Sequence, residues 1–380
     1  MELILTEDQE LLAKTAADFV SEHSPVSRVR KLRDTRDPVG FSRALWKQMA
    51  ELGWLGIPFP ESVGGAGLGF AELAVVLEAL GRTLAPEPFL STVLLGGQAL
   101  RLGGSEAQQK EWLSPLVNGD CILTAAYQEP QSRYDLYRVA TRAEKSGDGF
   151  RLSGEKIGVL DGHQADALVV VARTSGGERD PAGLTLFLVR KGSPGLDITR
   201  QGRVDSRNAA LVKFSRVEVG PSDVIGTVGE GGPLFERVVD RATVGLCAEM
   251  LGSMEEAAAI TFKYLKTRVQ FGVAIGSFQA LKHRAARMYI ELELSRSSVM
   301  AAARAVDEDH PELAKLTSLV KARCSEAGIL IANEAIQMHG GVGMTDEYDI
   351  GFYLKRARVA EITFGDASHH RERWARLSGY

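Results

Sequence analysis

The amino-acid sequence predicts a mainly α-helical protein with a central β domain. Apolar residues recur at three- and four-residue spacing in the first third of the 380-residue chain, which is typical of packed helices. The middle third changes to short runs rich in β-branched residues, and the last third returns to helical spacing. We therefore expect an N-terminal helical domain at 1–120, a middle β-barrel domain at 121–225 and a C-terminal four-helix bundle at 226–380.

Two capping boxes mark helix starts in the N-terminal domain. Thr6 is followed three residues later by Gln9, and Ser105 is followed in the same way by Gln108. Each pair can satisfy the free N–H groups at a helix N-terminus. We therefore expect helices to begin directly after Thr6 and after Ser105.

Four β-rich runs define the middle domain. Turn-forming residues such as Ser146-Gly-Asp-Gly149 separate them, which is typical of strands joined by tight connections. The predicted strands are 150–152, 167–172, 184–189 and 210–219.

Two long apolar stripes run through the C-terminal domain. The first steps by three or four residues from Leu251 to Leu265, and the second from Met288 to Ala303. The break at 307–311 separates two long helices. Such stripes indicate helices that pack on one another in a bundle rather than a cofactor site.

Composition and charge exclude several classes of protein. A net charge of -4 and a pI of about 6.1 give no basic surface for nucleic acid or for an anionic membrane. No apolar run reaches the ~18–20 residues of a membrane span, and the acidic start lacks the pattern of a signal peptide. The widely spaced Cys121, Cys247 and Cys324 indicate buried thiols in a reducing cytoplasm, without a disulfide framework or a metal site.

Four segments resemble signatures of the acyl-CoA dehydrogenase superfamily, in the same order and at suitable separations. They are Tyr127-Gln-Glu-Pro130, Gly154-Glu-Lys156 through Asp166, Arg268-Val-Gln-Phe-Gly272 with Phe278-Gln279, and Gln337-Met-His-Gly-Gly341 with Thr345 and Glu347. The likeness covers essentially the whole chain, and the ordered set is far more specific than any single motif. It implies an enzyme that binds FAD and dehydrogenates acyl-CoA thioesters, as in fatty acid β-oxidation, with an electron-transfer flavoprotein as the electron acceptor.

Three further segments resemble the small subunit of pimeloyl-CoA dehydrogenases, in a branch that includes two-subunit bacterial enzymes. They are Gln131-Ser-Arg-Tyr-Asp-Leu136, Ser277-Phe-Gln-Ala-Leu-Lys-His283 and Phe364-Gly-Asp-Ala-Ser-His-His370. This closer resemblance implies a tetramer that the chain forms either with a second acyl-CoA dehydrogenase subunit or with itself.

The resemblance implies a cofactor site made of residue types that suit a dinucleotide. A guanidinium group matches a pyrophosphate, amide side chains hydrogen-bond to an adenine or ribose edge, and glycines admit close backbone approach. Simpler alternatives remain open: a solvated Arg, aromatic rings that only fill the core, a plain glycine turn and a structural His339. The predicted cofactor-binding residues are Arg268, Gln270, Phe271, Phe278, Gln279, Gln337, Gly340, Gly341, Tyr127 and Gln128.

The catalytic base of this superfamily is absent from both places where the resemblance locates it. In the family a buried carboxylate takes the α-proton of the thioester while the β-hydrogen leaves as hydride to the flavin. Here the two positions hold Phe364 and Ala242, and neither side chain accepts a proton. The nearby carboxylates Asp240, Glu236 and Asp366 are the remaining candidates, so the catalytic residue stays unknown.

The flavin side of the pattern is altered as well. Gly158 stands where the family usually has a Trp over the ring, Leu160 stands where it has a Thr, and Gln128 replaces the Thr beside Glu-Pro. Asp366 replaces a Thr near the pyrophosphate, where a carboxylate repels phosphate oxygens.

One set of cofactor residues is altered and the other is retained, which suggests that two kinds of subunit share the site. In the family each FAD lies at a subunit interface, where one subunit supplies the flavin face and its neighbour supplies the adenosine motifs. This chain keeps the adenosine motifs and loses the residues of the flavin face. That combination favours a half-site, non-catalytic subunit of a heterotetramer. The alternatives are a self-sufficient homotetramer with a relocated base, and a non-enzymatic binding protein that lost FAD.

Overall fold

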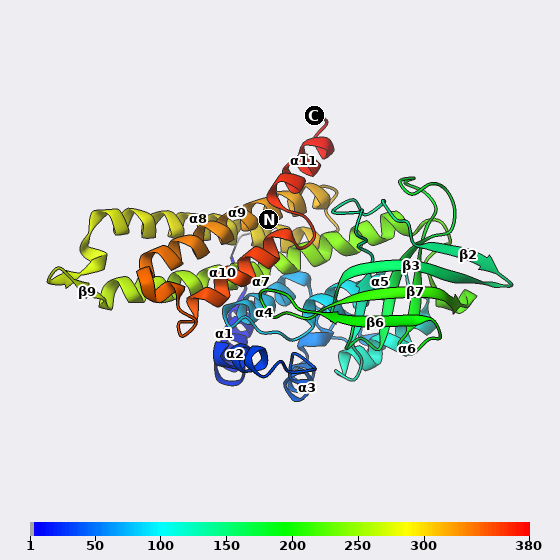
Figure 1. Ribbon diagram of the computed structural model, residues 1–380, viewed down its shortest axis with the longest axis horizontal. Helices are drawn as coiled ribbons and strands as arrows, with labels where there is room; N and C mark the ends of the chain where they lie inside the picture. The colour runs from blue at the N-terminus through cyan, green and yellow to red at the C-terminus, as the bar shows by residue number, and fades with distance from the viewer. Residues whose placement is uncertain (1–3) are drawn as a thin grey trace. The chain divides into compact units, whose positions relative to one another are not determined.

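The computed structural model describes residues 4–380, and the chain forms two compact units (Figure 1). The helical unit comprises the chain up to residue 35 together with 69–85 and 243–380. The mixed unit comprises 36–68 and 86–242. The predicted domain boundaries after residues 120 and 225 stay predictions.

Long helices make up the helical unit. A short hairpin interrupts them where α7 ends, and a glycine-rich turn follows α9. The elements are α1 (Glu7–His23), α2 (Val26–Asp34), α4 (Phe70–Arg82), the second part of α7 (Gly231–Thr267), β9 (Val269–Gln270), β10 (Val273–Ala274), η5 (Ile275–Ser277), α8 (Gln279–Asp307), α9 (Leu313–His339), η6 (Gly340–Met344), α10 (Ile350–Ile362) and α11 (Ala367–Leu377).

The mixed unit combines a sheet with short helices. Its helical elements are α3 (Arg43–Glu51), η1 (Trp54–Gly56), η2 (Glu61–Val63), the π-helix η3 (Phe89–Gly97), α5 (Gln98–Gly103), α6 (Glu106–Val117) and η4 (Pro221–Asp223). Its strands are β1 (Leu123–Ala126), β2 (Arg142–Ser146), β3 (Gly149–Leu160), β4 (Ala167–Arg173), β5 (Leu184–Arg190), β6 (Leu196–Gln201), β7 (Ala209–Val219) and β8 (Val224–Ile225).

The predicted barrel is wrong, because the sheet of the mixed unit is open. Its strand order is β6-β7-β3-β2-β4-β5-β8, and β1 pairs in parallel with β4. The outermost strands, β6 and β8, do not pair with each other in the described part of the chain. Alternating and β-branched patterns predict strands, but closure depends on whether two distant edges meet, which no local pattern encodes.

Most local predictions are confirmed. Both capping boxes form, with Thr6 and Ser105 each accepting from the backbone N–H three residues on. The four predicted strands fall within β3, β4, β5 and β7, and the predicted turn joins β2 to β3. The break at 307–311 separates α8 from α9. These features rest on short-range chemistry, which explains why the sequence predicts them.

The backbones of α4 and α7 approach each other closely at two glycines. A Cβ atom on Gly252 would lie 1.8 Å from the carbonyl oxygen of Glu78, and one on Gly81 would lie 2.0 Å from that of Glu249. Any side chain at either position would therefore force the two helices apart.

Among residues 4–380, no helix is both long and apolar enough to cross a membrane. The same residues contain no group of three or more His, Cys, Asp or Glu side chains arranged to hold a metal ion. The three cysteines are buried, as the sequence predicts.

Candidate cofactor site

A hairpin at the end of the helical bundle carries the first group of predicted cofactor residues (Figure 1). Arg268 follows α7, and its carbonyl accepts from Ile275 N at 2.8 Å, which closes the hairpin. At the tip, Phe271 adopts the left-handed conformation with φ 54° and is 91% exposed. Its ring stands almost perpendicular to that of Phe278, with 6.1 Å between centroids. The backbone conformation of Phe271 is therefore unfavourable for a bulky side chain, and its ring is accessible from outside the described chain.

The second group lies at the end of α9. Gln337 is exposed on its last turn, and Gly340 ends the helix with φ 63°. A Cβ atom on Gly340 or Gly341 would meet no heavy atom within 4 Å, so the backbone faces open space there. A ligand can therefore approach this main chain closely.

Side-chain contacts bring the two groups together at one end of the bundle. Arg284 near the start of α8 pairs with Glu334 near the end of α9, at 2.9 Å. The ring of His339 lies 4.4 Å from that of Tyr264, which precedes Arg268 by four residues on α7. The buried His339 uses Nδ1 on the carbonyl of Ala335, at 2.7 Å, so its visible role is structural.

The Arg268 side chain forms no hydrogen bond or ion pair with the described residues. Gln270 and Gln279 are exposed beside it on the hairpin and on the first turn of α8. A free guanidinium with neighbouring amide groups and an open glycine turn is a donor set suited to an anionic dinucleotide. The cofactor role of these residues stays a prediction.

The remaining predicted residues, Tyr127 and Gln128, lie in the mixed unit after β1. The Gln128 carbonyl accepts from Ile157 N at 2.8 Å, which aligns this segment with β3. Gly158 on β3 has φ 61°, and a Cβ atom there would lie 3.7 Å from Oε1 of Gln128. The Tyr127 ring packs against Phe235 with 5.1 Å between centroids.

Sequence reasoning missed a buried ion pair beneath this segment. Nζ of Lys156 lies 2.7 Å from Oε1 of Glu129 and 3.1 Å from the carbonyl oxygen of Tyr127. Glu129 also accepts from the backbone N–H groups of Ala140 and Thr141. Both residues lie inside motifs named in the sequence analysis. Their opposite charges could therefore have predicted that they form an ion pair.

A second buried carboxylate was also missed. Asp161 follows Leu160 directly, and its Oδ2 accepts from the hydroxyl of Ser91 on η3 at 2.6 Å. Burial raises the pKa of Asp161, although the hydrogen bond from Ser91 and the nearby Arg207 oppose that shift. A carboxylate next to a predicted strand end was a weak signal, because such residues usually lie in solvated turns.

The two family base positions hold side chains without acid–base chemistry. Ala242 is fully buried on α7, and Phe364 sits in a left-handed turn with φ 63°. Asp366 caps α11, because its Oδ1 accepts from His369 N at 2.8 Å. Asp240 is buried on α7 and already has an interaction partner. The catalytic role of Asp240 or Asp366 stays a prediction.

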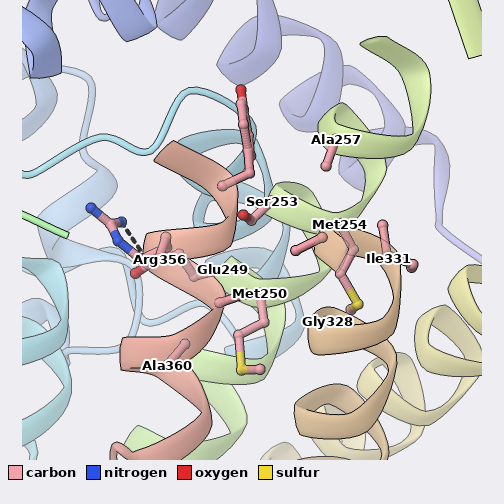
Figure 2. Close-up of a pocket in the computed structure, with 12 residues that line it drawn as sticks. Glu249, Met250, Ser253, Met254, Ala257, Gly328, Ile331, Arg356 and Ala360 are labelled. Carbon is pink, nitrogen blue, oxygen red and sulfur yellow. Dashed lines mark hydrogen bonds and ion pairs between the residues drawn. The ribbon is translucent and has the colours of Figure 1, made fainter. Parts of the chain in front are cut away.

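A small cavity lies between α7, α9 and α10 (Figure 2). Its volume is about 20 Å³, and its wall includes Met250, Met254 and Gly328 beside the ion pair of Glu249 with Arg356, at 3.0 Å. Such a volume holds about one water molecule, whereas ligand pockets typically measure ~300–1,000 Å³. The cavity is therefore not a substrate site.

The helical, sheet and helical segments follow the order expected of an acyl-CoA dehydrogenase fold. The chain belongs to the acyl-CoA dehydrogenase family: the family's N-terminal domain matches residues 6–120, its middle domain 124–217 and its C-terminal domain 229–378.

Named relatives match almost the full chain. The mitochondrial isovaleryl-CoA dehydrogenase of Pongo abelii is 30% identical over 380 residues, covering 97% of this chain and 88% of that protein. One chain in the structure of the ChsE4-ChsE5 complex from Mycobacterium tuberculosis is similar, with a TM-score of 0.90 and 30% identity, covering 100% of this chain and 100% of that chain. Butyryl-CoA dehydrogenase from Megasphaera elsdenii gives a TM-score of 0.91 and 26% identity, also over 100% of both chains.

Family membership confirms two expectations. The chain belongs to a class of oxidoreductases that act on CH–CH bonds, and the cofactor of that class is FAD. It also confirms the order of helical, β and helical segments.

Proposed function

We propose that this chain is the half-site subunit of a heteromeric, FAD-dependent acyl-CoA dehydrogenase. One observation carries the proposal: the adenosine-type residues are retained and open, while the flavin-type residues are lost. Arg268 at the end of the bundle has no partner in the described chain, whereas Gly158, Leu160 and Phe364 replace the family's ring-facing and basic side chains. A subunit that completes a neighbour's site needs only the first set.

The residues at the end of the bundle fit the adenosine and pyrophosphate of FAD. The free guanidinium of Arg268 suits a pyrophosphate, the amides of Gln279 and Gln337 suit an adenine or ribose edge, and Gly340 and Gly341 leave room for close contact. Bound FAD supplies the hydride acceptor of the reaction. In this proposal the present chain only binds and covers the adenosine end, and the partner subunit handles the α-proton.

Several finer assignments belong to the same proposal. We place the chain near the small subunit of pimeloyl-CoA dehydrogenases, in a tetramer that works in acyl-CoA β-oxidation and passes electrons to an electron-transfer flavoprotein. Support comes from the 30% identity to one chain in the structure of the ChsE4-ChsE5 complex, whose two components have different names. Exposed apolar side chains at the same end, Phe271 and Met344 among them, provide an interface for such a partner.

Co-purification with a partner tests the proposal. The chain is expressed alone and together with a candidate catalytic acyl-CoA dehydrogenase subunit, and native mass and flavin absorbance are measured. We expect two FAD molecules per four subunits in the complex, and no acyl-CoA dehydrogenation by this chain alone. Turnover by the single polypeptide with four FAD per homotetramer would contradict the proposal.

A self-sufficient enzyme remains the second candidate because of Asp240. This carboxylate is 7% exposed on α7, two residues before Ala242, and a general base of the family type must be buried. If the chain is active alone, Asp240→Asn should abolish turnover. A protein without flavin in both preparations would instead indicate a non-enzymatic binding protein.

A further inference from the structure

Lys321 on α9 is a fully buried cation whose hydrogen-bond partners are all uncharged. Its Nζ donates to Ser325 Oγ at 3.0 Å, to the Glu361 carbonyl at 2.8 Å and to the Gly365 carbonyl at 2.7 Å. An ammonium group has three N–H donors, and all three are used here. Burial of a charge without a carboxylate partner is costly, so this arrangement requires an explanation.

Of the two carbonyls that Lys321 binds, that of Glu361 lies in the last turn of α10 and that of Gly365 lies in the connection between α10 and α11. In this turn Phe364 has φ 63° and Gly365 has φ 117°. A left-handed conformation is unfavourable for a bulky residue and persists only where the surroundings fix it. A Cβ atom on Gly365 would lie 2.5 Å from Cδ2 of His369, so the turn also packs tightly against α11.

His370 on α11 binds the same turn from the other side. It is 2% exposed, and its Nε2 lies 3.1 Å from the carbonyl oxygen of Phe364. Burial and the nearby Lys321 lower the pKa of His370 to about 2, so the ring is neutral and Nε2–H donates to that carbonyl. Two buried side chains therefore hold the carbonyls of Glu361, Phe364 and Gly365.

We propose that Lys321 and His370 are positioning residues that clamp the 363–366 turn, so that residue 364 is presented in one fixed direction. The proposal rests on the proposed function in one respect, because the family resemblance makes position 364 the site of the base. This chain keeps the clamp although the presented side chain is an apolar ring. The phenyl ring of Phe364 removes acid–base chemistry from the base position, while the clamp keeps the turn around it fixed.

Local hydrogen exchange of the full chain in its assembled form tests the clamp. Lys321→Met keeps the length of the side chain and removes all three donors. Because hydrogen bonds to charged donors contribute about 1.5–3 kcal/mol, exchange across residues 361–370 should accelerate about 10- to 100-fold. Ser325→Ala removes the side-chain acceptor and keeps both backbone carbonyl acceptors, so it should leave exchange in the turn unchanged.

A pH series on the unmodified protein provides a second test that needs no variant. Burial lowers the pKa of Lys321 to about 8, and a neutral amine has only two donors for three acceptors. Exchange in the turn, corrected for its intrinsic pH dependence, should therefore rise as the pH passes through about 8. The other titratable groups that face Lys321 are Cys247, Cys324, Glu361, Asp366, His369 and His370.

Cys247→Ala is the matched control for the pH series, because it removes a facing thiol and should preserve the rise. A uniform acceleration over α9 and α10 in Lys321→Met would show general destabilisation and overturn the proposal. Unchanged exchange in the turn across both tests would overturn it as well. Neither result depends on the number of FAD molecules bound, so failure of the clamp and failure of the half-site function are distinguishable.

Discussion

The ammonium of Lys156 lies 2.7 Å from the carboxylate of Glu129, and both side chains are almost fully buried. This ion pair joins β3 to the segment that follows β1, where the predicted Tyr127 and Gln128 lie. Buried pairs contribute little net stability when intact, but removing one partner leaves a charge without solvent or counterion. The stability of the mixed unit should therefore depend strongly on keeping both members of this pair.

We expect Glu129→Gln to lower the free energy of unfolding by about 3–5 kcal/mol, because it removes the buried counterion of Lys156 and the charged acceptor of the Ala140 and Thr141 N–H groups. Urea unfolding measures the loss. Glu155→Gln is the matched control: Glu155 lies on β3 next to Lys156, in an exposed pair with Lys213 at 3.7 Å, and its loss should cost at most about 1 kcal/mol. Equal losses in the two variants would contradict the assigned role of the buried pair.

Acid should destabilise the protein through Glu129. Burial alone would raise the pKa of this carboxyl, but Lys156 and the backbone donors outweigh it and lower the pKa from 4.5 to about 2. A lowered carboxyl pKa gives stability that is present above the ordinary pKa and is lost as the pH falls through the lowered one. The free energy of unfolding should therefore fall between about pH 4.5 and about pH 2, and Glu129→Gln should show a shallower fall. Identical pH profiles would count against this assignment.

Two glycines on neighbouring helices should respond to alanine with opposite signs. A Cβ atom on Gly328 would lie 3.7 Å from Cε of Met250, at the small cavity in Figure 2. Gly328→Ala should therefore raise the free energy of unfolding by about 0.5–1 kcal/mol, since alanine favours a helix interior. Gly252→Ala should lower it, because its Cβ would lie 1.8 Å from the Glu78 carbonyl. Thermal unfolding compares the two, and a shift of the same sign in both would contradict the packing described.

Arg268→Ala should weaken FAD retention in the assembled enzyme about 10- to 100-fold, since a charge-assisted contact contributes about 1.5–3 kcal/mol. Flavin release during dialysis measures the change. Lys266→Ala removes an exposed positive charge two residues earlier and should leave retention unaltered. Unchanged retention in Arg268→Ala would show that this guanidinium does not bind the pyrophosphate.

Phe271→Gly should separate the stability of the chain from its assembly. Glycine adopts the φ of 54° freely, so the isolated chain should gain up to about 1–2 kcal/mol. The lost ring should at the same time weaken association, because an aromatic side chain that is 91% exposed in the single chain is available for an interface. Thermal unfolding and sedimentation measure the two effects. Unaltered association would exclude Phe271 from the interface.

Local chemistry explains which parts of the fold were predictable. The capping box at Thr6 and the β-branched run of β4 each act over a few residues, so the sequence predicts them. The short strand β6 was missed because most of its residues are exposed and polar, which weakens the pattern of a strand. The barrel was predicted wrongly because closure depends on distant edges.

In the candidate site, too, local motifs were predictable from the sequence and long-range contacts were not. Arg268 and Gly340 belong to contiguous motifs, so the amino-acid sequence alone identifies them as candidates. The clamp of Lys321 was invisible, because two of its acceptors are backbone carbonyls and every residue type carries one. A lysine within an apolar stretch of α9 was the single available signal.

The open sheet has a consequence for the solution behaviour of the protein. An unpaired edge strand is a template on which another chain can add a strand, and this is a common route to aggregation. The edge strand β6 carries the exposed side chains of Asp197 and Arg200, and Arg200 bonds to the carbonyl of Asp37 at 2.6 Å. The opposite edge, β8, is only two residues long. The charged side chains of β6 and the short length of β8 therefore disfavour the addition of a strand from another chain at either edge.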